Sequence, residues 1–184
     1  MTGSGVLVFS GPPCSGKSSV AKALAADSSR TSTVIIEIDD LFTVLFPKSD
    51  WNRTDRMLAY DASHEMARML VERGRTVVVE CTYSRRQQRA SLVSAIASIP
   101  SAPLWVVEFA VPADHAVKRW HHRNLTKQLV RRRNATFPYS DQTLRLDTST
   151  AAPHELAQQI NMWLAGHPTP VQRDVWAAGG NDWD

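Results

Sequence analysis

The segment Gly11–Ser18 constrains this chain more than any other part of its sequence. It reads Gly-Pro-Pro-Cys-Ser-Gly-Lys-Ser, fits the pattern Gly-x-x-x-x-Gly-Lys-Ser/Thr, and joins an apolar run, residues 6–10, to a helix-forming run, residues 19–26. In this context glycines let the main chain curl so that its N–H groups point at phosphate oxygens, and the helix start adds its positive dipole end. A chance glycine-rich turn would not match every fixed position, so the segment predicts a nucleotide-binding loop.

The residue types within the loop predict its ligands, which are ATP and Mg²⁺. Lys17 can reach the β- and γ-phosphates, and the hydroxyl of Ser18 can ligate Mg²⁺. The other residues expected around the phosphates are Gly11, Pro12, Pro13, Cys14, Ser15, Gly16 and Ser19.

Strand-like runs alternate with helix-like runs along the chain, which predicts an α/β fold with a parallel sheet covered by helices on both faces. The strand-like runs are almost entirely apolar, as strands buried on both faces require. They are residues 6–10, 34–38, 76–81, 105–109 and 144–146. The main helices are expected at residues 53–73, 85–99, 114–124 and 153–164.

Length and composition bound the organisation of the chain. Its 184 residues favour one domain, which we place at residues 1–166, followed by an irregular tail at residues 167–184 that is rich in Pro and Gly. A formal net charge of +3 does not by itself imply a nucleic-acid partner, and two cysteines do not suggest a disulfide framework. No signal peptide and no membrane-spanning run are recognisable, so a cytoplasmic location is expected.

Acidic residues follow two of the predicted strands, at the edge of the sheet where ligands bind in open α/β folds. The second strand ends in Glu37-Ile38-Asp39-Asp40, and strand alternation would put Glu37 and Asp39 on one side. Asp39 is the candidate general base, or a group that holds Mg²⁺ through water. Asp40 is the candidate N-cap of a helix that begins at Leu41, and it is also a candidate acceptor contact.

The third strand carries Glu80 at its tip, where an unpaired charge would be costly. Two interpretations are open for this side chain. It could bind metal-bound water or a substrate group, or it could form a salt bridge with an arginine of the following segment. The candidate arginines are Arg85, Arg86 and Arg89.

Between Lys118 and Arg133 the chain carries seven Lys and Arg residues and no acid. This concentration favours a basic lid, placed at about residues 124–140, that closes over the triphosphate. A phosphate-rich substrate, a nucleic acid and a solvated basic face are the alternatives. The arginines expected to contact the nucleotide are Arg119 and Arg123, with one or more of Arg131, Arg132 and Arg133.

Together, the loop, the strand that ends in Asp39, the Glu80 strand and the Arg119/Arg123 helix resemble the small P-loop kinases. The similarity is greatest to the branch that contains chloramphenicol phosphotransferase, the polynucleotide kinase domain and zeta-toxin-like kinases. The resemblance implies a five-stranded sheet in the order 2-3-1-4-5 and Asp39 as the base that activates the acceptor hydroxyl. The polynucleotide kinase form has an Arg where this chain has Phe42, which counts against a 5′-hydroxyl nucleic-acid substrate.

We therefore expect a kinase that transfers the γ-phosphate of ATP to a hydroxyl of a small molecule. An antibiotic, a nucleoside, a sugar nucleotide and an amino-acid derivative are all open as acceptors, and nucleic acid is the less favoured partner. A polynucleotide kinase and a regulatory nucleotide-binding module that transfers nothing are the rival interpretations. Phe42, Phe46 and Trp51 could form an apolar wall of the acceptor site. The polar acceptor contacts expected are Asp40, Arg53, Arg56, Glu80, Tyr83 and Arg86.

Overall fold

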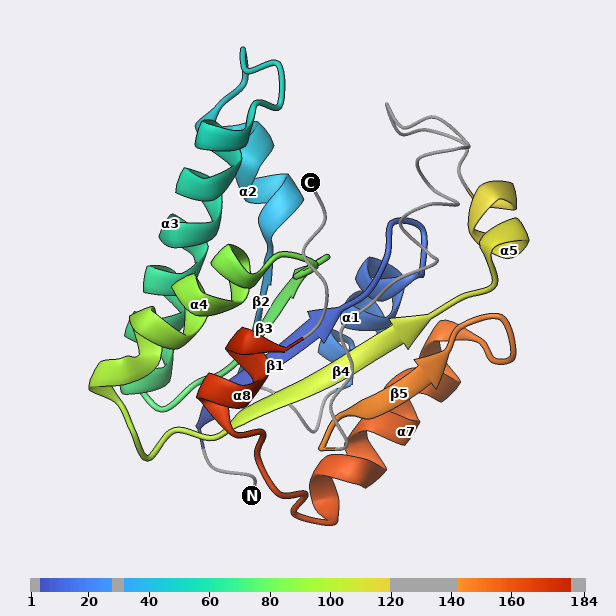
Figure 1. The fold of residues 1–184 in the computed structure, drawn as a ribbon. Helices are drawn as coiled ribbons and strands as arrows, with labels where there is room; N and C mark the ends of the chain where they lie inside the picture. The colour runs from blue at the N-terminus through green and yellow to red at the C-terminus, as the bar shows by residue number, and fades with distance from the viewer. Residues whose placement is uncertain (1–3, 28–31, 120–141, 180–184) are drawn as a thin grey trace.

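The computed structural model describes residues 4–27, 32–119 and 142–179. They contain a five-stranded parallel sheet in the order β2-β3-β1-β4-β5 (Figure 1), which confirms the expected α/β class and strand order. The strands are β1 (Gly5–Ser10), β2 (Thr33–Glu37), β3 (Thr76–Cys81), β4 (Leu104–Ala110) and β5 (Leu144–Asp147).

The three central strands are apolar because helices cover both of their faces. Alternate residues of β1 separate the two cores: Val6 and Val8 belong to one cluster of buried side chains, and Leu7 and Phe9 belong to the other. The carboxyl ends of all five strands meet at one edge of the sheet, where the phosphate-binding loop follows β1.

Helices α1 (Lys17–Ala25) and α7 (Pro153–Ala165) cover one face, which we call the α1–α7 face. Leu24 of α1 and Ile160 of α7 are fully buried against this side of the sheet. Pro153 occupies the first turn of α7, where its missing N–H costs nothing, and the Glu155 carboxylate accepts a hydrogen bond from the main-chain N–H of Ala152 at 2.7 Å.

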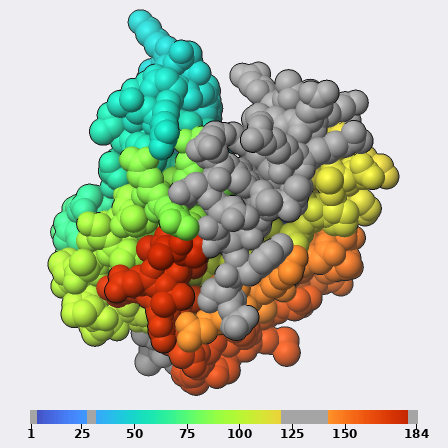
Figure 2. All heavy atoms as spheres, in the orientation of Figure 1, coloured from blue at the N-terminus to red at the C-terminus, as the bar shows by residue number. Residues whose placement is uncertain are grey.

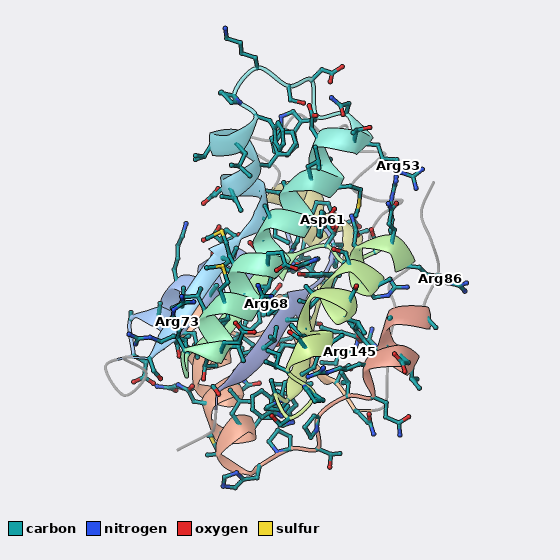
Figure 3. The ribbon with its side chains drawn as sticks, turned by 90° about the vertical axis from the view of Figure 1, so that its left-hand side faces the viewer. Arg53, Asp61, Arg68, Arg73, Arg86 and Arg145 are labelled. Atoms are coloured by element: carbon teal, nitrogen blue, oxygen red, sulfur yellow. The ribbon has the colours of Figure 1, made fainter. Side chains whose placement is uncertain are left out.

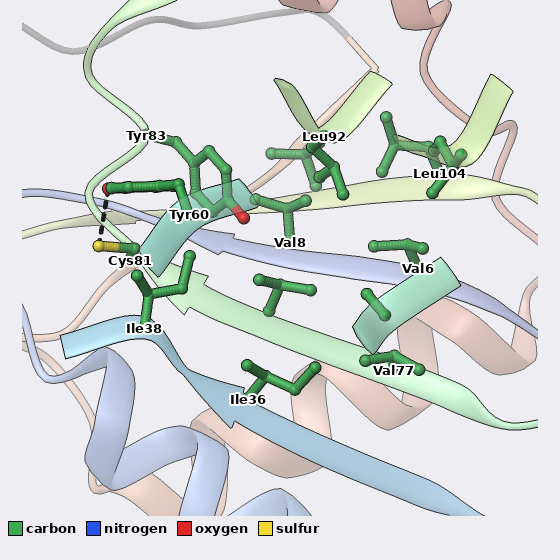
Figure 4. Close-up of a cluster of buried hydrophobic side chains, with 14 of the residues drawn as sticks. Val6, Val8, Ile36, Ile38, Tyr60, Val77, Cys81, Tyr83, Leu92 and Leu104 are labelled. Carbon is green, nitrogen blue, oxygen red and sulfur yellow. Dashed lines mark hydrogen bonds between the residues drawn. The ribbon is translucent and has the colours of Figure 1, made fainter. Parts of the chain in front are cut away.

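The opposite face, called the α3–α4 face, is covered by α2 (Ile38–Leu45), α3 (Arg53–Glu72), α4 (Arg86–Ala95) and α8 (Arg173–Ala178). A short 3₁₀ helix, Ile96–Ser98, continues α4, and α5 (Ala113–Lys118) follows β4. Figure 4 shows the core on this side, in which the valines of the strands pack beneath Tyr60, Tyr83 and Leu92.

The start of α2 differs from the expectation. The second strand ends at Glu37, and α2 begins at Ile38 rather than at Leu41, so Asp39 and Asp40 lie in its first turn and Asp40 is not its N-cap. Carboxylates in a first turn are favoured by the helix dipole, which explains the early start. The expected placement of Glu37 and Asp39 on one side is wrong, because the strand alternation stops before Asp39.

The tail is not irregular throughout, because residues 173–178 form α8. Trp176 of α8 is buried against the α3–α4 face and contacts the ring of Tyr83. Arg173 donates hydrogen bonds to main-chain carbonyls at the end of the α4 segment, those of Ile96 at 2.8 Å and Ile99 at 3.0 Å. The tail therefore packs on the domain, and a boundary at residue 166 stays a prediction.

The expected lid at about residues 124–140, like Arg123, Arg131, Arg132 and Arg133, lies outside the described residues. Helix α5 begins one residue before the expected 114–124 helix, and its described part ends at Lys118. Within the described part of the chain, none of the helices combines the length and apolar character that a membrane crossing requires.

Candidate functional site

The loop between β1 and α1 has the backbone shape that its glycines predict. Gly16 precedes α1 with a φ of 87°, and Cys14 adopts a φ of 63°, so the main chain curls through the left-handed region twice within three residues. A Cβ at Gly11 would lie 2.7 Å from the carbonyl oxygen of Phe109, which leaves no room for any side chain there. These constraints fix the curl that turns main-chain N–H groups inward.

Lys17 lies inside this curl. Its buried ammonium group donates hydrogen bonds to the carbonyl oxygens of Gly11 and Pro12, each at 3.0 Å. These carbonyl groups therefore hold the Lys17 ammonium at the loop. From there it can bind an anion that also contacts the N–H groups of the loop.

Glu80 faces the phosphate-binding loop from the neighbouring strand β3. Its Oε2 accepts a hydrogen bond from the Ser18 hydroxyl at 3.0 Å, and its Oε1 lies 3.6 Å from Lys17 Nζ. Of the two interpretations left open by the sequence, the salt bridge to Arg85, Arg86 or Arg89 is not the one formed. A hydroxyl beside a carboxylate is a hard-oxygen donor set that fits Mg²⁺, which keeps several waters and binds through few protein groups.

Asp39 lies at the same edge of the sheet but faces the other side. Its Oδ1 is 3.6 Å from a terminal nitrogen of Arg56 on α3 and 3.8 Å from the sulfur of Cys81. Burial raises the pKa of the Cys81 thiol to about 12, so this neighbour stays protonated and neutral. Asp39 is therefore a partly exposed acid in the first turn of α2, and Arg56 is a charged neighbour.

Glu37, by contrast, forms an ion pair with Lys22 of α1 at 3.6 Å, on the α1–α7 face. Burial raises the pKa of Glu37, with smaller contributions from the carboxylates of Glu80 and Asp40. Asp40 is exposed, and its carbonyl oxygen accepts a hydrogen bond from Thr43 at 2.7 Å. Asp39 is thus the acid of this segment that faces α3.

Arg119 approaches the loop from the end of α5. It donates hydrogen bonds to the hydroxyl of Thr148 at 2.8 Å and to the carbonyl oxygen of the same residue at 2.5 Å. The guanidinium lies beside the loop, because a Cβ added at Gly16 would be 3.7 Å from one of its nitrogens. Arg119 therefore lies at the loop, and its predicted contact with the nucleotide stays a prediction.

The predicted acceptor residues are brought together only in part. Arg53 and Arg86 extend to the same side from the N-terminal ends of α3 and α4 (Figure 3), and Arg53 donates to the side-chain oxygen of Gln87 at 3.3 Å. Tyr83, however, is fully buried, and its hydroxyl lies 2.9 Å from Nε2 of His64. This burial argues against the predicted contact between Tyr83 and an acceptor.

A line of polar side chains that the sequence did not predict runs from exposed Asp61 through half-buried Ser91 to buried His64 and Tyr83. The Ser91 hydroxyl donates to Asp61 at 2.5 Å and lies 2.7 Å from Nδ1 of His64. Because the single Ser91 proton goes to Asp61, Nδ1 must carry the ring proton and Nε2 must accept from Tyr83. Burial lowers the pKa of His64 to about 3, so the ring is neutral and fixes the position of Tyr83.

Arg89 is a second buried group that the sequence analysis did not place. Its guanidinium is fully buried and donates to the carbonyl oxygens of Tyr83 at 2.8 Å and Trp176 at 3.1 Å, and to that of Gly179. It therefore ties the segment after Glu80 to the C-terminal end of α8. No local sequence signal marks this role, because the two partners at the end of α8, Trp176 and Gly179, are 87 or more residues away in the chain.

Three solved structures illustrate the fold that the chain shares. A sugar kinase from Janibacter sp. is 18% identical (88% of this chain, 95% of that chain, TM-score 0.64). The APS kinase CysC of Mycobacterium tuberculosis, in complex with AMPPNP and APS, is 18% identical (90% and 99%, TM-score 0.69). A gluconokinase from Sinorhizobium meliloti 1021 is 22% identical (89% and 93%, TM-score 0.64). At these identities the likeness shows the fold alone.

Among curated proteins, no sequence matches the chain significantly. The family described as "AAA domain", however, matches residues 6–145, a span that runs from β1 into β5 and includes the phosphate-binding loop, Asp39, Glu80 and Arg119. That match covers well over half of the sequence. The chain therefore belongs to the AAA domain family and has its α/β P-loop fold.

Proposed function

We propose that the protein is an ATP- and Mg²⁺-dependent kinase that phosphorylates a hydroxyl group of a small molecule. The observation that carries the proposal is the pair of acids at one edge of the sheet. Glu80 faces the loop and contacts Lys17 and Ser18, whereas Asp39 faces α3. In the proposal, the acid beside the loop works next to the phosphates, and the acid that faces α3 works where the acceptor approaches them.

Each residue has a separate task in this proposal. The loop N–H groups and Lys17 hold the phosphates, and Ser18 and Glu80 bind Mg²⁺ directly or through its waters. When bound, Mg²⁺ neutralises charge on the β- and γ-phosphates. Asp39 orients the acceptor hydroxyl and takes its proton, while Arg119 and, in the proposal, Arg123 stabilise charge on the transferring group. Catalysis of this kind depends mostly on positioning and electrostatics.

The names of the three structural neighbours support a small molecule as the acceptor. They describe kinases of a sugar, of gluconate and of APS, and the APS kinase structure contains the ATP analogue AMPPNP. The same fold also occurs in an RNA repair complex that contains Pnkp1, so a 5′-hydroxyl oligonucleotide belongs in the test as a rival acceptor.

The experiment compares Asp39→Asn with Asp174→Asn, a matched change at an exposed Asp of α8. Transfer from γ-labelled ATP is measured against a library of hydroxyl compounds, including a 5′-hydroxyl oligonucleotide at two salt concentrations. Losing a general base lowers kcat by about 10²–10⁴-fold, so Asp39→Asn should abolish most transfer while ATP binding is kept, and Asp174→Asn should retain transfer.

Two results would contradict the proposal. If the wild-type protein hydrolyses ATP at one rate with every hydroxyl compound and labels none, it is a nucleotide-binding module or a slow NTPase. If only the oligonucleotide is labelled, and binding weakens steeply with salt, it is a polynucleotide kinase.

A further inference from the structure

Beside Asp39, α2, the start of α3 and the loop between them form a corner of one arginine and three aromatic rings. We call Phe42, Phe46, Trp51 and Arg56 the Arg56–Trp51 corner. The ring of Trp51 stacks on that of buried Phe42 with centroids 4.2 Å apart, and Phe46 lies 5.5 Å from Phe42. Arg56 lies 5.4 Å from the Trp51 ring centroid, and it also faces Asp39 at 3.6 Å.

The loop before α3 holds Trp51 in an unusual backbone conformation although its ring is only partly buried. The residue has a φ of 65°, a left-handed conformation that is unusual for a bulky side chain, and it is still 40% exposed. Side-chain hydrogen bonds fix the loop around it: Asp55 accepts from Ser49 and from Asn52, each at 2.7 Å, and Ser49 accepts from the N–H of Trp51 at 3.2 Å. Such fixed strain is typical of binding sites.

Arg56 has donors left for a ligand. Guanidinium carries five N–H donors in a planar fork. Arg56 approaches Asp39 at 3.6 Å, longer than a hydrogen bond, and one further donor is directed to the hydroxyl of Tyr60, so most of the five stay available. The fork matches the geometry of a carboxylate, sulfate or phosphate, and each such charged hydrogen bond is strong. An anion bound by Arg56 would therefore lie close to Asp39, the proposed base, because the same arginine contacts both.

The charge around the corner favours the same kind of ligand. Arg53 and Arg86 extend from the N-terminal ends of α3 and α4 to one side, and Arg53 reaches across to Gln87 (Figure 3). Both N-terminal ends also add the positive ends of their dipoles. Figure 2 shows the tip formed by α2 and the start of α3 standing above the rest of the described surface, so ligands can reach it.

From this arrangement we infer that the acceptor carries an anionic group, a carboxylate, sulfate or phosphate, which Arg56 binds while the carbon skeleton packs on the ring of Trp51. The inference rests on the proposed kinase function and narrows its substrate class. Asp39 then meets a hydroxyl of the same molecule, and Arg56 bridges the base and the anion. The γ-phosphate passes from ATP to that hydroxyl oxygen, the bond to the β-phosphate oxygen breaks, ADP leaves, and the hydroxyl proton goes to Asp39.

The test uses hydroxyl compounds in matched pairs that differ only in the anion. The pairs are D-gluconate with D-glucitol, glycerol 3-phosphate with glycerol, and a nucleoside 5′-monophosphate with its nucleoside. Transfer from ATP is measured for the full chain with Mg²⁺, and the carboxylate and phosphate arms identify which anion is preferred. We expect kcat/KM to be at least about 30-fold higher for the anionic member of a preferred pair.

Variants then assign that preference to the corner. Arg56→Ala should remove most of it, mainly through KM, and Arg56→Lys should restore part because it keeps the charge but loses the fork. Trp51→Ala should weaken both members of a pair by a similar factor of about 3–10, since it removes a contact with the carbon skeleton. Arg73→Ala, at the other end of α3 in Figure 3, is the matched control and should keep the wild-type preference.

The outcomes distinguish a failure of the anionic-acceptor inference from a failure of the proposed kinase function. Transfer to neutral and anionic members with equal efficiency, or an equal loss of both in Arg56→Ala, overturns the anionic acceptor and leaves the kinase. If nothing is phosphorylated, binding of gluconate and glycerol 3-phosphate is measured by calorimetry with AMPPNP and Mg²⁺ present, so that the phosphate-binding loop is already filled. A preference over the neutral partners that Arg56→Ala abolishes supports the anion site, and no preference overturns it.

Discussion

The α1–α7 face and the α3–α4 face of the sheet differ in the ionisable side chains that they bury. Among the described residues, buried ionisable groups on the α1–α7 face are confined to the loop region, where Lys17 and Glu80 contact each other. The α3–α4 face buries more of these groups, on α3, on α4 and at the ends of strands. They are Tyr60, His64, Cys81, Tyr83, Arg89 and Glu108.

The contrast separates a general part of the molecule from one that is specific to this chain. An apolar core needs only suitable volumes, so many sequences can support the loop on the α1–α7 face. Buried polar groups must each find partners, and a network such as Ser91–His64–Tyr83 fixes one arrangement of its helices. We infer that the face that carries the proposed acceptor site is the one whose geometry the sequence specifies most narrowly.

An effect as large as that of Asp39→Asn should come from the α1–α7 face. Lys17→Ala removes a charge that the loop holds against the phosphates, so ATP turnover with every acceptor should fall by about 10²–10³-fold or more. Lys22→Ala is the matched control, because Lys22 is on the same helix but forms an exposed ion pair with Glu37. Steady-state kinetics with two acceptors of different affinity checks the result.

One result for Lys17→Ala would contradict the contrast between the two faces. If Lys17→Ala lowered transfer to one acceptor and spared another, the loop would take part in acceptor selection, and the two faces would not divide the work. An equal loss of transfer to both acceptors would support the division of roles between the two faces of the sheet.

A smaller effect, on stability, should come from Arg89 on the α3–α4 face. Arg89→Met keeps most of the volume but leaves the carbonyl oxygens of Tyr83 and Trp176 without this donor. Unpaired buried carbonyls cost about 1–3 kcal/mol each, so the free energy of unfolding should fall by about 3 kcal/mol in urea titrations. Arg86→Ala, at an exposed position of the same helix, is the control and should change it far less.

The same variant tests whether the tail supports the site. Because Arg89 joins the segment after Glu80 to α8, Arg89→Met should also raise protease sensitivity near residues 173–179. A variant as stable as the wild type would show that the tail packs through Trp176 and Arg173 alone.

Sequence reasoning identified what local pattern encodes. The loop, the apolar strands and the helix beginning at Pro153 follow from spacing and periodicity, and the structure confirms them. The strand order was implied by the resemblance to the small P-loop kinases, and the structure confirms it as well. The contact between Glu80 and Ser18 could have been predicted, because the strand order puts β3 beside β1 and so brings Glu80 next to the loop that follows β1. It was missed because the nearby arginines offered an equally simple partner for the carboxylate.

Other features depend on contacts between distant segments and could not be read from local pattern. Tyr83 looked like a loop residue near the site, but His64 of α3 and Trp176 of α8 hold it in the core. The helix α8 is only six residues long, which is too short to form without the packing of its tryptophan. Asp39 was found, but its position in a helix was not, because a short strand followed by acids fits a turn equally well.

Glu108 provides the smallest test of the comparison and the only one that should increase stability. It lies on β4 two residues after Val106, so it faces the α3–α4 side, and it is 2% exposed. Within the described part of the chain, neither of its carboxyl oxygens has a hydrogen-bond partner. Burial raises the pKa of Glu108 to about 8. The Thr143 side chain, which approaches the carboxyl without reaching hydrogen-bond geometry, and the charges of Arg145 and Arg89 oppose this shift by smaller amounts.

The sign of the pH dependence follows from that shift. In the unfolded chain Glu108 loses its proton near the ordinary value of 4.5, whereas the folded protein keeps it up to about pH 8. Between these values the folded state binds more protons, so the stability due to this group is complete below pH 4.5 and is lost as the pH rises to 8. Glu108→Gln cannot ionise, and it should be more stable than the wild type by about 1–2 kcal/mol at pH 8 and nearly equal at pH 5. Urea titrations at the two pH values measure the difference, and a variant less stable at both would show that the carboxylate has a partner on this face and that its burial is compensated.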